Sequence, residues 1–380
     1  MLATIKVCEA KKEKTYMTKQ FRKIGILTSG GDAPGMNACV RAVTRYAIKC
    51  GIEVYGIYEG YKGLIEGNIK KFAPHDVANI IEKGGTILYS ARCPEFKEEP
   101  GILKAVGVCR EFGIDGIVAI GGDGTFRGAS DLCRYGISCI GIPGSIDNDI
   151  TCTDNSIGFD TAMNTVVEAV DRLRDTCESH ARCNVVEVMG RNAGYIALET
   201  GIAVGATAVV IKEDLNYSEE ELLNKIHEGR KAGKRNFIVI VAEGVENYSE
   251  KLAKTIQEKT GVETKFARLA HIVRGGSPSL ADRLLAARMG VAAVDMLMEG
   301  MENVFVCERD GKMVPADIQE AIVMDRMYKS TFTPSVKYPE EALKTYSPEK
   351  IEYMMNFCVM REKEIKELIT TAEDISNYSV

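Results

Sequence analysis

Short segments that are apolar throughout alternate with helical segments along most of the chain, and glycine-rich turns separate them. The first unit contains a strand expected at residues 24–27, a turn at 28–35 and a helix at 36–49. Strands without a polar face are typical of parallel sheets that helices cover on both sides. The alternation therefore predicts an α/β fold built on mostly parallel sheets.

The same unit recurs downstream. A strand expected at 116–120 leads into a second Gly-Gly-Asp turn and a helix through Leu132, and a strand at 138–142 leads into a polar turn. The Gly-Gly-Asp sequences at 30–32 and 121–123 form a weak internal repeat. Further strands are expected at 53–57, 185–189, 208–211 and 237–242, and further helices at 160–176, 219–231 and 277–300.

These elements form two series, so we predict two doubly wound, mostly parallel-sheet domains that meet near Gly158. Asp310-Gly311 indicates a hairpin after the long helix, and apolar residues at helical spacing follow Pro348. Near Arg274 the chain is expected to return to the first domain, which makes that domain discontinuous. The predicted limits are 22–158 plus 274–323 for the first domain, 159–273 plus 324–345 for the second, 1–21 for an N-terminal extension and 346–380 for a C-terminal helical extension.

Composition restricts the class of protein. The 380 residues include 54 acidic and 48 basic side chains, and the net charge of -6 argues against a broad basic face for nucleic acid. The longest apolar run, 201–211, is shorter than the roughly 18 residues that a membrane span needs. The first 21 residues lack the apolar core of a secretory signal, and they leave Met1 and Met17 both open as the start.

The chain has 12 cysteines, but none belongs to a C-x-x-C pair and most lie inside apolar runs. In a chain of this length the pattern favours reduced, buried thiols over a disulfide framework, so we expect a cytoplasmic protein. The cysteines expected to be buried include Cys39, Cys109, Cys133 and Cys139.

The polar turn after the strand at 138–142 contains Ser145, Asp147 and Asp149. If this segment is extended, its alternate side chains point the same way. Two carboxylates so close repel each other unless a cation or a proton separates them. A magnesium nucleotide and a substrate hydroxyl need such an arrangement, although a polar turn that caps the next helix would look similar.

Both Gly-Gly-Asp turns end strands where helices begin. Such turns present free backbone N–H groups and the positive end of a helix to anions. At Gly31, Gly122, Gly124 and Thr125 the backbone can approach a nucleotide closely. The Asp123 carboxylate suits a phosphate site only if a metal cation lies between them.

Six segments are spread from residue 23 to about 300: 27–38 (LTSGGDAPGMNA), 84–96 (GGTILYSARCPEF), 121–125 (GGDGT), 143–150 (PGSIDNDI), 185–194 (VVEVMGRNAG) and 271–278 (HIVRGGSP). Together they resemble bacterial ATP-dependent 6-phosphofructokinases of the phosphofructokinase A family. They occur in the family's order without large insertions, which is more specific than any one motif.

The resemblance implies catalytic roles for four residues. Asp147 would be the base that takes the proton of the sugar 1-hydroxyl, and Asp149 would orient the site. Ser145 stands where many relatives have threonine, and its hydroxyl could still bond the moving phosphoryl group. Arg191 would stabilise the charge of that group.

The resemblance also implies a nucleotide site mainly on the first domain. Asp123 would hold Mg²⁺, which arrives with ATP as the phosphoryl donor. Arg92 would reach the nucleotide phosphates with its planar fork of donors. The implied nucleotide contacts are Gly31, Arg92, Cys93, Gly122, Asp123, Gly124 and Thr125.

The sugar site would lie mainly on the second domain. Glu243 would accept hydrogen bonds from sugar hydroxyls, and His271 and Arg274 would bind the 6-phosphate. In this family Arg182 reaches the 6-phosphate from a neighbouring subunit, which implies a homotetramer. Lys265 stands where an arginine is usual, so phosphate binding is weaker or Arg268 substitutes. The implied sugar contacts are Ser145, Asp147, Arg182, Met189, Gly190, Arg191, Glu243, Lys265, His271 and Arg274.

Regulation is only partly implied. Arg41, Arg45, Arg174 and Lys234 match the basic effector pocket that bacterial members form between subunits. Charged residues of that pocket are replaced by Asn68, Ala232 and Thr207. We therefore expect a muted response to phosphoenolpyruvate.

Two rival functions remain at this point. The first is the same fold with pyrophosphate as donor, but relatives of that kind usually carry aspartate at position 124 and lysine at 144, where this chain has Gly124 and Gly144. The second is a non-catalytic binder of sugar phosphates or nucleotides. Such a binder has no need for Asp123, Asp147 and Asp149 together.

Overall fold

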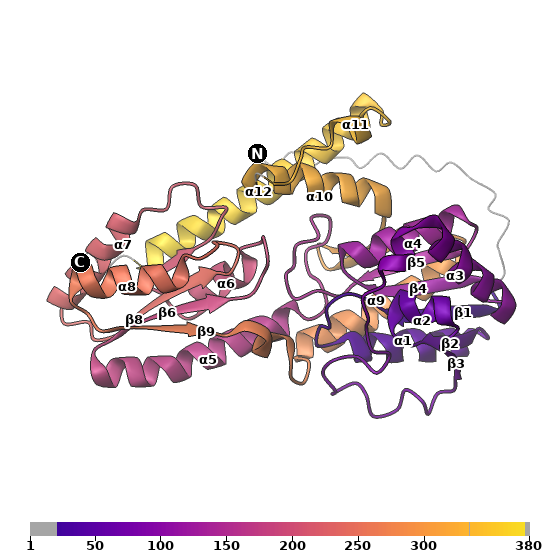
Figure 1. Cartoon of the computed structure of the whole chain (residues 1–380), viewed down its shortest axis with the longest axis horizontal. Coiled ribbons are helices and arrows are strands. Elements are labelled where there is room, and N and C mark those ends of the chain that lie inside the picture. The colour runs from indigo at the N-terminus through magenta and orange to yellow at the C-terminus, as the bar shows by residue number, and fades with distance from the viewer. Residues whose placement is uncertain (1–20, 334, 377–380) are drawn as a thin grey trace, which may run out of the picture.

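The computed structural model describes residues 21–333 and 335–376. The described chain forms an elongated molecule with one β-sheet in each of two lobes (Figure 1). Residues 1–20 of the predicted N-terminal extension and residues 377–380 of the C-terminal one lie outside the described residues.

The first sheet has seven strands in the order β11-β10-β5-β4-β1-β2-β3. The five inner strands are parallel, while β3 and β11 pair antiparallel at the two edges. The strands are β1 Lys23–Thr28, β2 Glu53–Ile57, β3 Ile69–Phe72, β4 Gly116–Gly121, β5 Ser138–Pro143, β10 Val304–Arg309 and β11 Lys312–Asp317.

Helices cover both faces of this sheet, which is why its central strands have no polar face. Along β4, Val118 and Ile120 pack in the core shared with α1 and α9, whereas Ile117 and Ala119 pack in the core shared with α3 and α4. The helices of this lobe are α1 Met36–Lys49, α2 Gly60–Glu66, η1 Pro94–Lys97, α3 Glu99–Phe112, α4 Asp123–Arg134 and α9 Leu280–Met298.

The second sheet is fully parallel, with the order β7-β8-β6-β9. The prediction of mostly parallel, doubly wound sheets is confirmed. The strands are β6 Cys183–Val188, β7 Ala208–Val210, β8 Phe237–Ala242 and β9 Thr264–Arg268. The helices are α5 Phe159–His180, α6 Tyr195–Ala203, α7 Glu219–Lys231, α8 Ser249–Thr260 and η2 Ala270–Arg274.

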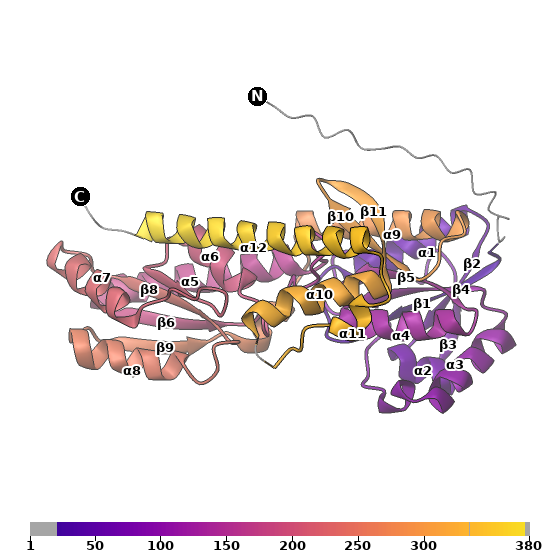
Figure 2. The same ribbon diagram turned by 90° about the horizontal axis from the view of Figure 1, so that it is seen from above.

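The chain returns to the first lobe through α9, which packs along α1 (Figure 2). The predicted hairpin then joins β10 to β11, and both turn residues have positive φ, 48° at Asp310 and 69° at Gly311. The domain limits themselves stay a prediction, and the one between residues 323 and 324 falls within helix α10 (Ile318–Phe332).

The C-terminal segment is helical, as the spacing of its apolar residues predicted. After α10 come α11 (Glu340–Leu343) and the long α12 (Pro348–Ser376). Helix α12 lies along both lobes (Figure 2). Its Met354 and Cys358 belong to the core under α10, and Ile365 belongs to the core that α6 shares.

The described residues include no helix with the length and apolarity that crossing a membrane requires. The cysteines of the described residues are free thiols and most are buried. Cys39, Cys109 and Cys139 are buried as expected, whereas Cys133 is only partly covered.

One buried carboxylate fastens the start of α5 to α9. Asp282 accepts hydrogen bonds from the Gly158 N–H at 2.7 Å and the Thr161 N–H at 2.8 Å, and also from the Thr161 hydroxyl. These N–H groups belong to the first turn of α5, where a helix has no internal acceptors. Asp282 therefore fixes the point at which the chain passes from one lobe to the other.

We predict that Asp282→Ala destabilises the protein by about 2–4 kcal/mol, because two buried N–H groups lose their acceptor. Asp282→Asn keeps the size of the side chain and one acceptor oxygen, so it should cost less. Urea denaturation of the three proteins measures the difference. Equal stability of wild type and Asp282→Ala would show that the junction does not depend on this residue.

Candidate active site

Three turns meet at one edge of the first sheet, because β1, β4 and β5 are neighbouring parallel strands whose carboxyl ends coincide. The Ser29 N–H donates to the Ile120 carbonyl at 3.0 Å, and the Gly144 N–H donates to the Gly121 carbonyl at 2.9 Å. A Cβ at Gly121 would lie 2.3 Å from the Ser29 carbonyl oxygen, so only glycine allows this contact. The structure thus brings both Gly-Gly-Asp turns to the polar turn after β5.

The segment 145–149 is a turn and is not extended, so the condition under which its alternate side chains would point the same way is not met. Asn148 has a φ of 48°, a left-handed conformation that asparagine tolerates. Its side chain donates to the Asp154 carbonyl at 3.0 Å and accepts from the Ser156 N–H at 3.0 Å. The Ser145 hydroxyl accepts from the Asp147 N–H at 3.3 Å. The backbone therefore turns here through local hydrogen bonds.

Asp147 is the most unusual carboxylate of the site. Its side chain is 3% exposed, and its Oδ1 has no hydrogen-bond partner among the described residues. Its Oδ2 lies 3.4 Å from Arg191 Nε. Burial, then the charge of Asp149, and more weakly that of Glu243, raise the pKa of Asp147 to about 6, although Arg191 and Arg274 act in the opposite direction. Such a group can accept a proton near neutral pH.

The second lobe contributes Arg191 through the loop after β6. The Gly190 and Arg191 N–H groups donate to Glu243 Oε1 at 3.2 and 2.8 Å. Glu243 follows β8, so the carboxyl ends of two neighbouring strands of the second sheet shape this loop. Met189 and Gly190 are buried beneath it, while the Arg191 side chain is 65% exposed. Arg191 thus reaches from the second lobe to a carboxylate of the first.

Arg274 also joins the two lobes. It ends η2, and its guanidinium lies so close to Gly31 that a Cβ there would be 2.0 Å from Nη1. Its buried Nε has no partner among the described residues. The sequence assigned Gly31 to the nucleotide and Arg274 to the sugar phosphate, and the structure places them in contact. His271, on the same turn, is exposed.

Asp123 begins α4 and is the candidate for a metal contact. Its carboxylate is partly exposed, and Arg127 Nε donates to both of its oxygens at 3.1 Å. Within residues 21–333 and 335–376 no group of three or more His, Cys, Asp or Glu side chains could hold a metal. Mg²⁺ usually binds through one or two carboxylates together with substrate phosphates. One partly exposed carboxylate at a glycine-rich turn where a helix begins is therefore compatible with Mg²⁺ that arrives with a nucleotide.

The remaining nucleotide candidates border this turn. A Cβ at Gly122 or Gly124 would meet no atom within 4 Å, so the space beside both residues is open. The Thr125 hydroxyl donates to the Ser29 carbonyl at 3.1 Å and is therefore engaged within the turn. Arg92 is exposed in the segment before η1, and Cys93 precedes the first residue of η1.

Arg182 and Lys265 lie at the other end of the second sheet. Arg182 Nε and Lys265 Nζ lie 2.8 and 2.9 Å from the two carboxylate oxygens of Glu263, and together they lower the pKa of Glu263 to about 2. These residues flank the amino ends of β6 and β9, whereas Glu243 follows the carboxyl end of β8. A strand of six residues spans roughly 17–20 Å, so neither cation reaches Glu243 within one chain. Arg268, the possible substitute, pairs with Glu187 at 2.6 Å.

The effector candidates fall into two groups. Arg41 and Arg45 lie on α1 in the first lobe, whereas Arg174 lies on α5 and Lys234 precedes β8 in the second (Figure 1). Arg174 and Lys234 line a hollow of about 470 Å³ that Ile375 of α12 also lines. The two groups do not form one site within a chain.

Sequence reasoning missed Lys329 and Asp325 of α10. Lys329 Nζ lies 3.0 Å from Asp149 Oδ2 and 3.6 Å from Asp325 Oδ2. Asp325 Oδ1 accepts the Thr151 N–H at 2.7 Å. In the sequence the two residues look like an ordinary helical i, i+4 ion pair, and nothing in that spacing points to the turn at 145–149.

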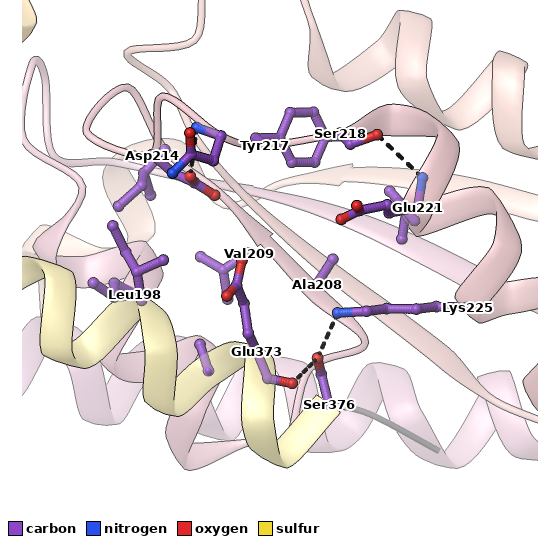
Figure 3. Close-up of a pocket in the computed structure, with 15 residues that line it drawn as sticks. Leu198, Ala208, Val209, Asp214, Tyr217, Ser218, Glu221, Lys225, Glu373 and Ser376 are labelled. Carbon is purple, nitrogen blue, oxygen red and sulfur yellow. Dashed lines mark hydrogen bonds between the residues drawn. The ribbon is translucent and has the colours of Figure 1, made fainter. Parts of the chain in front are cut away.

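Another hollow contains none of the predicted site residues. It lies between the last turns of α12, strand β7 and the start of α7 (Figure 3). Lys225 donates to the Ser376 hydroxyl at 2.9 Å across one side of it. The contact fastens the end of α12 to the second lobe.

Comparison with known proteins identifies the family of this chain. The family model described as Phosphofructokinase matches residues 23–297. The chain belongs to the phosphofructokinase family. The ATP-dependent 6-phosphofructokinase of Clostridium acetobutylicum is 52% identical over 308 residues, which cover 81% of this chain and 96% of that protein. The enzyme of the same name from Halalkalibacterium halodurans is 51% identical over 302 residues, 80% of this chain and 94% of that one.

Solved phosphofructokinase structures share the fold. The Saccharomyces cerevisiae phosphofructokinase matches with a TM-score of 0.78 and 34% identity, over 88% of this chain and 50% of that chain. This chain therefore spans half the length of the yeast chain. A pyrophosphate-dependent phosphofructokinase from Marinobacter aquaeolei matches with a TM-score of 0.68 at 24% identity, over 78% of this chain and 83% of that one, which shows the fold alone.

We predict that Asp147→Asn lowers kcat by ~10²-fold or more with little change in the binding of the sugar, because the amide cannot take the proton. In the wild type, kcat/KM should fall on the acid side of about pH 6, where the raised pKa of Asp147 leaves the carboxyl of the free enzyme protonated. Steady-state kinetics from pH 5 to 8 test both expectations. Wild-type turnover by the variant would refute the base role.

Proposed function

We propose that this protein transfers the γ-phosphoryl group of MgATP to the 1-hydroxyl of fructose 6-phosphate, giving fructose 1,6-bisphosphate and ADP in glycolysis. The observation that carries the proposal is the buried Asp147 carboxylate, whose Oδ1 is without a partner among the described residues where two lobes meet. About half of the residues are identical in relatives named for this activity, over nearly their whole length.

The chemistry follows from the groups around Asp147. Its carboxylate takes the proton of the sugar hydroxyl as that oxygen attacks the phosphoryl group. Arg191, 3.4 Å from Asp147, then offsets negative charge on the group in transfer. Glu243 holds the loop of Arg191 by accepting two backbone hydrogen bonds. In this position it would lie next to the bound sugar.

The nucleotide would lie along the turns at Gly31 and Gly122–Gly124, whose N–H groups and helix ends attract phosphates. Asp123 would hold Mg²⁺ together with the nucleotide phosphates, and the ion would neutralise part of the charge of these phosphates. Arg92 would extend toward these phosphates from the exposed segment before η1, since Ser90 of that segment donates to the Gly30 carbonyl at 2.6 Å.

The choice of donor depends on Gly124 and Gly144. The space beside Gly124 is open, while a Cβ at Gly144 would lie 3.1 Å from the Met36 methyl carbon and 3.2 Å from Ile120. Glycine at 124 leaves room for the α-phosphate, and glycine at 144 offers no cation for pyrophosphate. These residues favour ATP over the pyrophosphate-dependent alternative.

We expect efficient turnover of fructose 6-phosphate with MgATP and negligible turnover with pyrophosphate. Gly124→Asp should raise KM for ATP by at least tenfold, which corresponds to about 1.4 kcal/mol. The open space at Gly124 lets the variant fold, so the effect reports on the nucleotide. Efficient use of pyrophosphate by the wild type would overturn the assignment of the donor. The absence of turnover with either donor would favour a non-catalytic binder.

We also propose that the active sites are shared in a homotetramer. Arg182 and Lys265 form one basic cluster around Glu263, at the end of the sheet away from Glu243. Two adjacent cations suit the 6-phosphate of a sugar bound by a neighbouring subunit.

Arg182→Ala should raise KM for fructose 6-phosphate much more than KM for ATP. Mixing Arg182→Ala with inactive Asp147→Asn subunits should restore activity, because each variant supplies what the other lacks. Arg172→Ala removes an exposed arginine of α5 and serves as the control. If exchanging subunits produce no active hybrid, the shared site is refuted.

Two finer expectations stay predictions: a cytoplasmic location and a muted response to phosphoenolpyruvate. The second is supported by the replacement of charged pocket residues by Asn68, Ala232 and Thr207. Arg174, moreover, already donates to the Val204 carbonyl and to Asn236.

A further inference from the structure

One face of α10 holds the turn that contains the proposed base. Asp325, Tyr328 and Lys329 are spaced i, i+3 and i+4, so their side chains leave the helix on the same side. Asp325 accepts the Thr151 N–H at 2.7 Å, and Lys329 donates to Asp149 Oδ2 at 3.0 Å. Helix α10 therefore contacts the segment at 145–151 in two places, at the backbone N–H of Thr151 and at the side chain of Asp149.

Lys329 is a largely covered cation among carboxylates. Its side chain is 23% exposed. Burial acts to lower the pKa of Lys329, but Asp325, Asp149 and Asp123 outweigh it and raise this pKa well above its usual value. Lys329 consequently remains charged at any pH at which an enzyme of this kind would work.

Asp149 needs such a counter-ion because Asp147 lies next to it. The charge of Asp149 is, after burial, the largest influence that disfavours ionisation of Asp147. The other charged groups that face Asp147 are Arg191 and Arg274 from the second lobe, which favour ionisation, and Glu243, which opposes it. Lys329, whose Nζ lies 3.0 Å from Asp149 Oδ2, supplies that counter-ion and holds the Asp149 carboxylate against α10.

Helix α10 is in turn contacted by α6 and α12. The Tyr328 and Tyr195 hydroxyls are 3.1 Å apart, and the Arg361 guanidinium of α12 lies 5.4 Å from the centre of the Tyr195 ring. The Cys358 thiol donates to the Met324 carbonyl at 3.6 Å. Both α10 and α12 follow the region that the family model matches, which ends at residue 297.

We propose that Lys329 is a positioning residue for phosphoryl transfer: it holds the Asp149 carboxylate and thereby the turn that presents Asp147 to the sugar hydroxyl. The proposal rests on the function proposed above and adds a residue outside the motifs that indicated it. Lys329 acts through Asp149 and need not contact a substrate.

The test compares four variants. Lys329→Met should lower kcat by at least tenfold, with KM for both substrates changing by less than about threefold. It should also move the acid limb of kcat/KM to higher pH, because the negative charge of Asp149 would then act on Asp147 without its counter-ion. Lys329→Arg should recover most of kcat. Lys329→Gln, which is uncharged but polar, should behave as Lys329→Met, and it replaces that variant if thermal unfolding shows that Lys329→Met does not fold.

The fourth variant, Lys344→Met, removes an exposed lysine that pairs with the exposed Glu341 of α11, and it should leave kcat and the pH dependence of kcat/KM unchanged. In an Asp149→Asn background, removing Lys329 should cost little more, because the effect passes through Asp149. Equal losses of kcat in both backgrounds, or an unaltered acid limb in Lys329→Met, would overturn the proposal. An inactive wild type would instead refute the proposed function.

Discussion

The candidate site depends on keeping the buried carboxylate of Asp147 able to accept a proton although the Asp149 carboxylate lies nearby. Burying an ionised carboxylate is costly unless opposite charges and hydrogen bonds compensate for the lost water. Asp147 has no hydrogen bond to its Oδ1 among the described residues and has Asp149 nearby, so the compensation comes from cations. Arg191 and Arg274 come from the second lobe, and Lys329 of α10 holds Asp149. The two lobes and α10 must therefore converge on one short turn.

The parallel sheets make this convergence possible. The carboxyl ends of β1, β4 and β5 bring three turns together, and the ends of β6 and β8 bring Arg191 and Glu243 to face them. Each of these edges presents backbone donors and helix ends, which are groups that attract phosphates. Asp282 on α9 holds the start of α5, where the chain passes from one lobe to the other.

Local signals in the sequence predicted most of the fold. The predicted bounds of α1, β2, α7 and β8 agree with the structure, because apolar runs and turn residues mark both ends of each element. The turn at 145–149 was expected, but its conformation could not be predicted, since it depends on Asn148 bonding to residues several positions later. Lys329 lies 180 residues from Asp149 in the chain, and no local pattern reports such a contact. Likewise, only the structure shows that Lys265 joins Arg182 on Glu263.

The ionisation of Asp147 can be measured without turnover. Carbon-13 NMR of protein labelled at the aspartate carboxyl carbons, with Asp147→Asn used to assign the resonance, would follow this one group through a titration. The account predicts a midpoint near 6 in the free protein, because burial and Asp149 favour the protonated form. A midpoint at or below the roughly 3.9 of an unperturbed aspartate would contradict it.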